Sequence, residues 1–129
     1  MISVDGSGSA VPVLDGGTGA VAAVQRFNRA FDAQDVDAVM AAMTSDCRFE
    51  DTSPPDGRAH VGVDAVRAAW EALFTSAPQG VFGSEEVFEA GDRVVVRWRY
   101  AWGDGHVRGV DVFTVRDGLV AEKLAYVKG

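Results

Sequence analysis

The stretch that follows residue 18 carries apolar residues at the spacing of an α-helix. Val21, Val24, Phe27 and Phe31 recur at steps of three and four residues, so they share one helical face. Thr18 stands just before this stripe and is the expected N-cap, because its hydroxyl can accept a hydrogen bond from the first turn. The pattern predicts a first amphipathic helix here.

The same spacing predicts two further helices. Asp35 is the expected N-cap of a short second helix. Its apolar stripe consists of Val36, Val39, Met40 and Met43. The third helix begins after the turn-forming segment 53–57. Its stripe consists of Val63, Val66, Trp70, Leu73 and Phe74. Between the second and third helices, residues 47–51 alternate and predict a short strand with Phe49 and Asp51 facing inward.

Beyond Pro78 the period changes from that of helices to that of strands. The expected strands span residues 81–90, 93–102, 107–116 and 119–127. The turns between them fall at Gly91-Asp92, Asp104-Gly105 and Asp117-Gly118, and Asp-Gly favours a two-residue hairpin loop. Helices followed by a run of hairpins, without alternation of strand and helix, predict an α+β fold with an antiparallel meander.

The hairpin loops also predict which side chains share a face of the sheet. Two-residue loops at 104–105 and 117–118 would place Asp111 opposite both Trp98 and Leu124. The inner face would then carry Trp98, Tyr100, Trp102, Asp111, Phe113, Glu122 and Tyr126. The outer face would carry Val95, Arg97, Arg99, Val110, Val112 and Lys123. An aromatic face with acids set into it suits the wall of a pocket.

Asp111 is the leading candidate for chemistry. It stands in the apolar run 109–113, where a carboxylate must be paired, hydrogen-bonded or protonated with a raised pKa. Such groups are enriched at functional sites, and the alternative is a structural aspartate held by loop amides. Asp51 is the second candidate, at the rim of the expected pocket. A role for Asp51 as a cap or turn-former for the 53–57 loop is an equal alternative.

The remaining polar candidates have simpler alternatives. His60 precedes a helix start, and a structural or rim histidine is the alternative to a catalytic base. Tyr100 and Tyr126 could be core aromatics or donors to a ligand. Cys47 has no paired base and is expected to be an inert, small apolar residue.

Composition narrows the class of protein. At 129 residues the chain fits one domain, in which residues 1–18, rich in Gly, Ser and Asp, form a flexible arm and residues 19–129 the folded part. The net charge of −7 argues against nucleic acid as a partner. One cysteine and two histidines argue against a disulfide framework or a metal site. These cysteine and histidine counts fit a cytoplasmic protein best, and no apolar run is long enough for a membrane span. The excess of Arg, Ala, Gly and Val suggests a bacterial source.

Several short motifs resemble the SnoaL-like branch of the nuclear transport factor 2-like superfamily. The resemblance covers residues 21–129. The motifs are Arg26-Phe27-Asn28, Phe49-Glu50-Asp51, His60-Val61-Gly62 and Gly109-Val110-Asp111-Val112-Phe113, followed by Asp117-Gly118. It implies a cystatin-like α+β roll, with three N-terminal helices packed on a curved, mainly antiparallel sheet that encloses a conical pocket.

The same resemblance implies roles for two residues. Asp51 falls at the position of the general base of ketosteroid isomerase. Asp111 falls at that of its oxyanion-hole aspartate and of the acid/base proposed in SnoaL-type polyketide cyclases. Phe27 stands where the isomerase has its oxyanion tyrosine, and the last strand lacks the second acid of limonene epoxide hydrolase.

Two functions remain open at this point. The first is cofactor-independent acid/base chemistry on a small hydrophobic carbonyl compound through Asp111, in the manner of a cyclase or isomerase. The second is a binding or interaction domain without chemistry. The expected pocket lining consists of Phe27, Phe31, His60, Trp70, Trp98, Tyr100, Phe113 and Tyr126. Valines on the outer sheet face predict a homodimer through that face.

Overall fold

The computed structural model describes residues 19–128, and the predicted arm 1–18 lies outside this range. The helices are α1 (Ala20–Asp32), α2 (Val36–Ala41) and α3 (Val63–Ser76). The strands are β1 (Met43–Glu50), β2 (Ala59–Val61), β3 (Val81–Ala90), β4 (Arg93–Trp102), β5 (Gly105–Arg116) and β6 (Leu119–Val127). They form one sheet in the order β2-β1-β6-β5-β4-β3.

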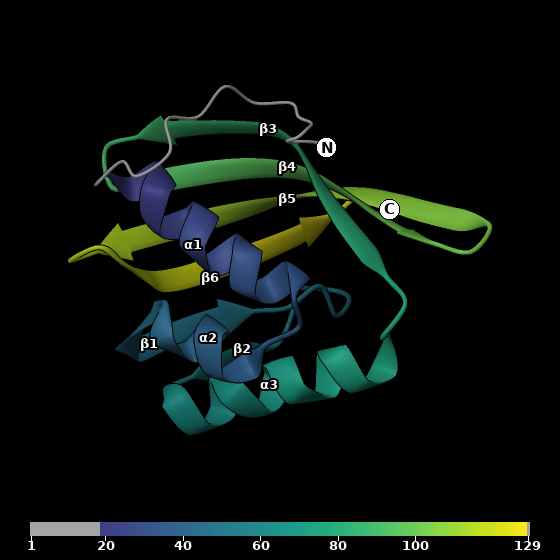
Figure 1. The fold of residues 1–129 in the computed structure, drawn as a ribbon, viewed down its shortest axis with the longest axis horizontal. Helices are drawn as coiled ribbons and strands as arrows, with labels where there is room; N and C mark the ends of the chain where they lie inside the picture. The colour runs from purple at the N-terminus through teal and green to yellow at the C-terminus, as the bar shows by residue number, and fades with distance from the viewer. Residues whose placement is uncertain (1–18, 129) are drawn as a thin grey trace.

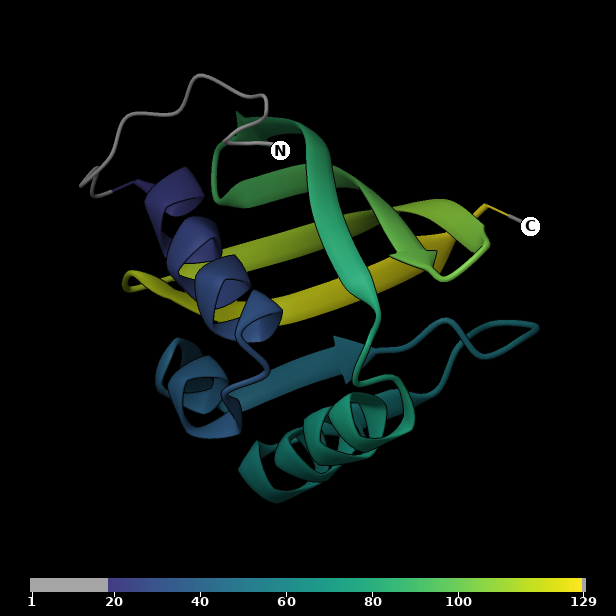
Figure 2. The same ribbon diagram turned by 45° about the vertical axis from the view of Figure 1, so that its right-hand side comes forward.

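The sheet is antiparallel except where β1 runs parallel to β6. That pairing joins the N-terminal part of the chain to the C-terminal meander. All three helices lie on the same side of the sheet, with α1 across the meander and α3 beside β1 and β2 (Figures 1 and 2). The predicted α+β architecture is confirmed.

The helix boundaries follow local signals, with two corrections. The N-cap of α1 is Gly19 and carries no side-chain cap, so the prediction of Thr18 as N-cap was wrong. Asp35 caps α2 as predicted, since its carboxylate accepts a hydrogen bond from the backbone N–H of Ala38 at 3.1 Å. Met43 does not belong to α2 but begins β1, because the helix ends at Ala41.

The first strand is longer than the sequence pattern suggested, and the second was not predicted. β1 begins at Met43, four residues before the predicted start, and residues 59–61 form the short strand β2. The pairing of Phe49 with His60 brings this strand against β1. Cys47 and Phe49 are buried as predicted, while Arg48 and Glu50 face the other way.

The core fills the space between helices and sheet. Phe27 of α1, Trp70 of α3 and Phe113 of β5 are fully buried, and the ring of Phe27 packs edge-on against the other two. Within residues 19–128, no helix is long and apolar enough to cross a membrane.

The β4–β5 hairpin turns one residue earlier than predicted, which shifts the pairing of the two strands by two positions. Trp102 pairs with Gly105, so the loop is Gly103-Asp104 rather than Asp104-Gly105. Gly103 supplies a positive φ of 39°, and Gly105 packs against the Trp102 ring where a Cβ atom would lie 2.9 Å from it. Asp111 therefore pairs with Val96, not Trp98. A shift of two positions preserves the faces, so Trp98, Tyr100 and Asp111 still share the inner face.

A β-bulge in β6 does change the faces. The loop 117–118 has the predicted length, and both residues have positive φ angles of 55° and 75°. Farther along the hairpin, Val115 pairs with Val120 but Thr114 pairs with Glu122, which leaves Ala121 as an extra residue. Asp111 consequently pairs with Ala125 instead of Leu124. The predicted faces of residues 122–126 were wrong because one extra residue exchanges the two sides of a strand.

Candidate functional site

A cavity of about 620 Å³ lies between α3, the end of α1 and the inner face of the sheet. Most of its wall is apolar, including Phe31, Phe49, Leu73, Phe82, Trp98 and Ala125. The polar groups on the wall include Asp51, Arg58, His60, Tyr100, Asp111 and Lys123. A mainly apolar cavity of this size with a few polar groups has the character of a small-molecule site.

Asp111 and Lys123 form an ion pair on this wall. The Lys123 Nζ lies 3.6 Å from the Asp111 Oδ2, and the two side chains are 7% and 10% exposed, respectively. Burial raises the pKa of Asp111, and the charge of Lys123 opposes that rise. Burial lowers the pKa of Lys123, with Asp111 and then Asp32 opposing the fall. Both shifts favour the neutral forms, because removal from water penalises each charge.

Aromatic rings surround the Lys123 ammonium. Its Nζ lies 4.2 Å from the centre of the Phe31 ring and 5.3 Å from those of Phe27 and Trp70. The rings of Phe49 and Phe113 are each 5.8 Å away. Ring faces attract a cation, so this surrounding offsets part of the cost of burying the lysine.

Asp32, at the end of α1, is a third ionisable group near this pair. It lines a small cavity of about 20 Å³ together with Asp111, Lys123 and Trp98. Burial raises the pKa of the Asp32 carboxyl to about 6, and Lys123 opposes the rise. The buried Trp98 Nε1 makes no hydrogen bond of normal geometry among the described residues, but its interaction with Asp111 also opposes the rise in the pKa of that carboxyl.

Asp51 and His60 form a second polar centre in the main cavity. The Asp51 Oδ2 lies 3.0 Å from the His60 Nε2, while its Oδ1 accepts hydrogen bonds from the backbone N–H groups of Ser53 and Arg58. Burial would raise the pKa of Asp51, but the hydrogen bonds from Arg58, His60 and Ser53 outweigh it and hold the pKa well below its usual range. The ionised carboxylate only accepts, so the neutral form of the His60 ring would donate through Nε2 and carry its lone pair on Nδ1.

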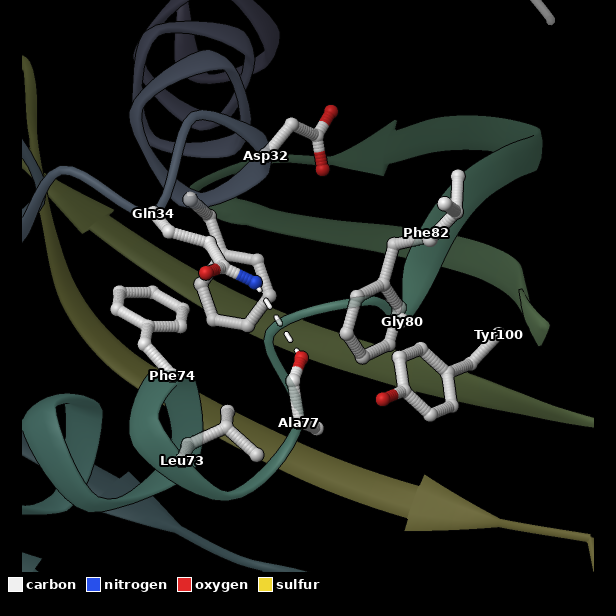
Figure 3. Close-up of a pocket in the computed structure, with 10 residues that line it drawn as sticks. Asp32, Gln34, Leu73, Phe74, Ala77, Gly80, Phe82 and Tyr100 are labelled. Atoms are coloured by element: carbon white, nitrogen blue, oxygen red, sulfur yellow. Dashed lines mark hydrogen bonds between the residues drawn. The ribbon is translucent and has the colours of Figure 1, made fainter. Parts of the chain in front are cut away.

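A side pocket of about 80 Å³ adjoins the main cavity near the start of β3 (Figure 3). The Gln34 amide donates a hydrogen bond to the Ala77 carbonyl at 3.4 Å and ties the end of α1 to the end of α3. Gly80 leaves room for the Tyr100 hydroxyl, since a Cβ atom there would lie 1.8 Å from it. Tyr100 and Phe82 line both pockets.

The structure distributes the predicted site residues over three regions. Phe31, Asp51, His60, Trp98, Tyr100 and Asp111 line the main cavity. Phe27, Trp70 and Phe113 are completely buried in the core. Tyr126 lies on the outer face and is 53% exposed, because the bulge turns it away from the cavity.

Lys123 is one of the site residues that the sequence pattern missed; Asp32 is another. Strict alternation assigned Lys123 to the outer face, whereas it is buried on the inner one. The adjacent apolar residues Val120 and Ala121 interrupt the alternation of the last strand, and this interruption was the available signal for a bulge.

Comparison with protein families identifies the chain. The pattern of the SnoaL-like domain matches residues 24–123. The chain belongs to the SnoaL-like domain family. No curated protein matches this SnoaL-like chain.

Several solved structures have the same fold as this chain. A nuclear transport factor 2-like protein of unknown function from Mesorhizobium loti is 40% identical, with a TM-score of 0.75 over 85% of this chain and 91% of that one. A protein described as a polyketide cyclase from Sinorhizobium meliloti is 26% identical, with a TM-score of 0.71 over 80% and 92% of the two chains. TerC, co-crystallized with polyporic acid, shares the fold at 18% identity, with a TM-score of 0.72 over 84% and 91%.

Proposed function

We propose that this SnoaL-like domain is a cofactor-independent acid/base enzyme that acts on a small hydrophobic carbonyl compound. The observation that carries the proposal is that one apolar cavity holds two polar centres whose carboxyl pKa values are shifted in opposite directions. Asp111 has a raised pKa, whereas Asp51 has a lowered pKa and holds His60. Carboxyl groups whose environments push their pKa values apart supply an acid and a base at the same pH.

One centre acts as the proton donor and the other as the proton acceptor. The Asp111–Lys123 pair holds one proton and donates it toward the carbonyl oxygen as negative charge develops there. His60 takes the proton from the carbon next to the carbonyl through Nδ1, and Asp51 stabilises the imidazolium that forms. The apolar wall, including Phe31, Phe82 and Trp98, binds the body of the substrate.

The proposal predicts that the protein exchanges carbon-bound protons of simple ketones. In heavy water at neutral pH, NMR would follow loss of the α-proton signals of cyclohexanone and 1-tetralone. We expect the wild type to accelerate the exchange, and Asp111→Asn and His60→Gln each to reduce the enzymatic rate by about 10²-fold, the lower end of the range for general acid or base groups.

Matched controls separate these roles from general effects of substitution. His106 is the other histidine of the chain and is exposed, so His106→Gln should keep the full rate. Asp104→Asn, in the exposed β4–β5 turn, should do the same. If the wild type binds the ketones, as measured by quenching of tryptophan fluorescence, yet exchanges their protons no faster than His60→Gln, the acid/base proposal is rejected.

A non-catalytic binding domain is the second candidate. The observation that favours it is the direct pairing of Asp111 with Lys123, which already compensates the buried charge without a substrate. Co-crystallization of TerC with polyporic acid gives an example of the same fold holding a small molecule. Ligand binding without proton exchange in the NMR experiment would support this candidate.

We further propose that the domain forms a homodimer through the outer face of its sheet. Val95, Val110, Val112 and Leu124 lie on this face, and next to them Phe88 and Tyr126 are 49% and 53% exposed. Glu86 pairs with Arg97 on the same face, and the two side chains form an ion pair of 3.0 Å. A symmetric partner would cover the exposed apolar area.

A further inference from the structure

We propose that Lys123 is a covalent binding site that forms an imine with small aldehydes and ketones in the cavity. Lys123 borders the cavity of about 620 Å³, and its Nζ lies beside a carboxyl group that can serve as a proton donor. Amine nucleophiles in desolvated, apolar surroundings are the ones that form such bonds with carbonyl compounds. This proposal does not depend on proton transfer by His60.

Burial away from water favours the neutral, nucleophilic form of Lys123, and it outweighs the two carboxyl groups, which favour the ammonium. The charged groups that act on it are Asp111 from β5 and Asp32 from α1, while the neighbouring side chains of β1 and α3 are the rings of Phe49 and Trp70. In such an apolar site a neutral amine beside a neutral carboxylic acid competes with the ion pair, because each charge is costly away from water. Transfer of one proton from Lys123 to Asp111 gives this neutral pair.

Each step of the reaction balances with these two groups alone. The Nζ lone pair attacks the carbonyl carbon, an N–C bond forms, and the nitrogen's proton moves to the former carbonyl oxygen. Asp111 then donates its proton to that hydroxyl, the C–O bond breaks and water leaves. The nitrogen lone pair completes the C=N bond, and the Asp111 carboxylate remains beside the iminium cation. The product is stabilised by the same aromatic rings that surround the ammonium.

Pentane-2,4-dione is a suitable probe because the iminium cation that it forms can lose a further proton. Loss of a proton from the carbon between the two carbonyls, returned to Asp111, converts the iminium into a neutral conjugated enaminone. This product absorbs in the near ultraviolet and adds the mass of one dione less one water. The reaction requires a neutral amine, so at pH 7 it discriminates strongly against ordinary lysines, whose unperturbed pKa is about 10.4.

The chain contains few lysines, so a label on Lys123 is easily told from a label elsewhere. Lys123 and Lys128 are its two lysines, and Lys128 lies exposed after the end of β6. The wild type and Lys128→Arg should each take up one dione at pH 7, and peptide mapping should place it on Lys123. Lys123→Arg should lose at least nine-tenths of this absorbance. His106→Gln, at an exposed histidine outside the cavity lining, should retain it. Asp111→Asn should label at least about tenfold more slowly, because it lacks the acid for loss of water.

The outcomes distinguish this site from the alternatives. Mapping on the wild type alone decides the assignment, so the test holds even if Lys123→Arg folds poorly. A label found only on Lys128 or the α-amino group would overturn the proposal. The absence of any label on folded wild type would also overturn it and would identify the Asp111–Lys123 pair as structural. Labelling of Lys123 without proton exchange in ketones would support the covalent site while rejecting the acid/base function.

Discussion

Gly109 lies opposite Trp98 on the neighbouring strand, and its missing side chain leaves room for the indole ring. A Cβ atom at this position would lie 2.3 Å from a Trp98 ring carbon and 2.2 Å from the Tyr126 carbonyl oxygen. One of these contacts is with backbone, which cannot move aside without disturbing the ladder. Gly109 thereby fixes the position of an indole that lines the cavity.

We predict that Gly109→Ala lowers the free energy of unfolding by about 1–3 kcal/mol, the usual cost of overpacking. Urea denaturation would measure this loss, and near-ultraviolet circular dichroism would report the displaced Trp98. Gly83→Ala is the matched control, because Gly83 also lies in a strand but a Cβ atom there would meet nothing within 4 Å. Equal stability of both variants would contradict the packing role of Gly109.

At the scale of elements, the loop 51–58 between β1 and β2 is organised around one carboxylate. Asp51 accepts hydrogen bonds from the backbone of Ser53 and Arg58, at 3.0 and 2.8 Å, and contacts His60. The backbone N–H of Asp51 also donates to the Arg58 carbonyl, which closes the loop at its base. These bonds hold both His60 and the rim of the cavity in place.

We predict that Asp51→Asn destabilises the protein by about 1–2 kcal/mol at pH 7, because it weakens charge-assisted hydrogen bonds. The folded pKa of Asp51 lies below the unfolded value of 3.8, so its stabilising effect is present above pH 3.8 and is lost as the pH falls through the folded pKa. Urea denaturation should therefore show the difference between the wild type and the variant shrinking below pH 4.

The matched control for this loop is Asp56→Asn, since Asp56 lies exposed in the same segment. Its stability should equal that of the wild type at every pH tested. A difference between the wild type and Asp51→Asn that stayed constant from pH 7 to pH 3 would contradict the role of the ionised carboxylate.

At the scale of the whole molecule, the two faces of the sheet differ in what covers them. The inner face is covered by helices and encloses the cavity, whereas the outer face carries half-buried valines and the exposed Phe88 and Tyr126 between charged side chains. Ion pairs such as Glu85–Arg108, at 3.0 Å, lie near the apolar residues. This mixture fits an interface with an apolar centre and a polar rim.

We predict that sedimentation equilibrium at micromolar concentration gives the wild type twice the chain mass of 13.6 kDa. Val112→Asp should sediment as a monomer, because two symmetry-related carboxylates would be buried at the interface. Val63→Asp, at an exposed position at the start of α3, should remain dimeric. A monomeric wild type would exclude the dimer, and a dimeric Val112→Asp would move the interface to another face.

Much of the fold could be predicted from the sequence because its signals are local. Apolar residues at helical spacing located all three helices, Asp35 marked the start of α2, and Gly91 and Asp117-Gly118 marked turns. Burial of Asp111 followed from its apolar neighbours, and the inward direction of Asp51 followed from alternation along residues 47–51.

The partner of Asp111 was decided by contacts between distant parts of the chain. Val120 pairs with Met43, and its backbone N–H donates to the Ala42 carbonyl at 2.9 Å, so the parallel pairing of β6 with β1 lies beside the bulge at Ala121. The sequence by itself determined the elements, the turns and the buried acid, because each depends on near neighbours. Only the tertiary structure put Lys123 beside that acid, because one extra residue in a strand changes which face every later side chain occupies.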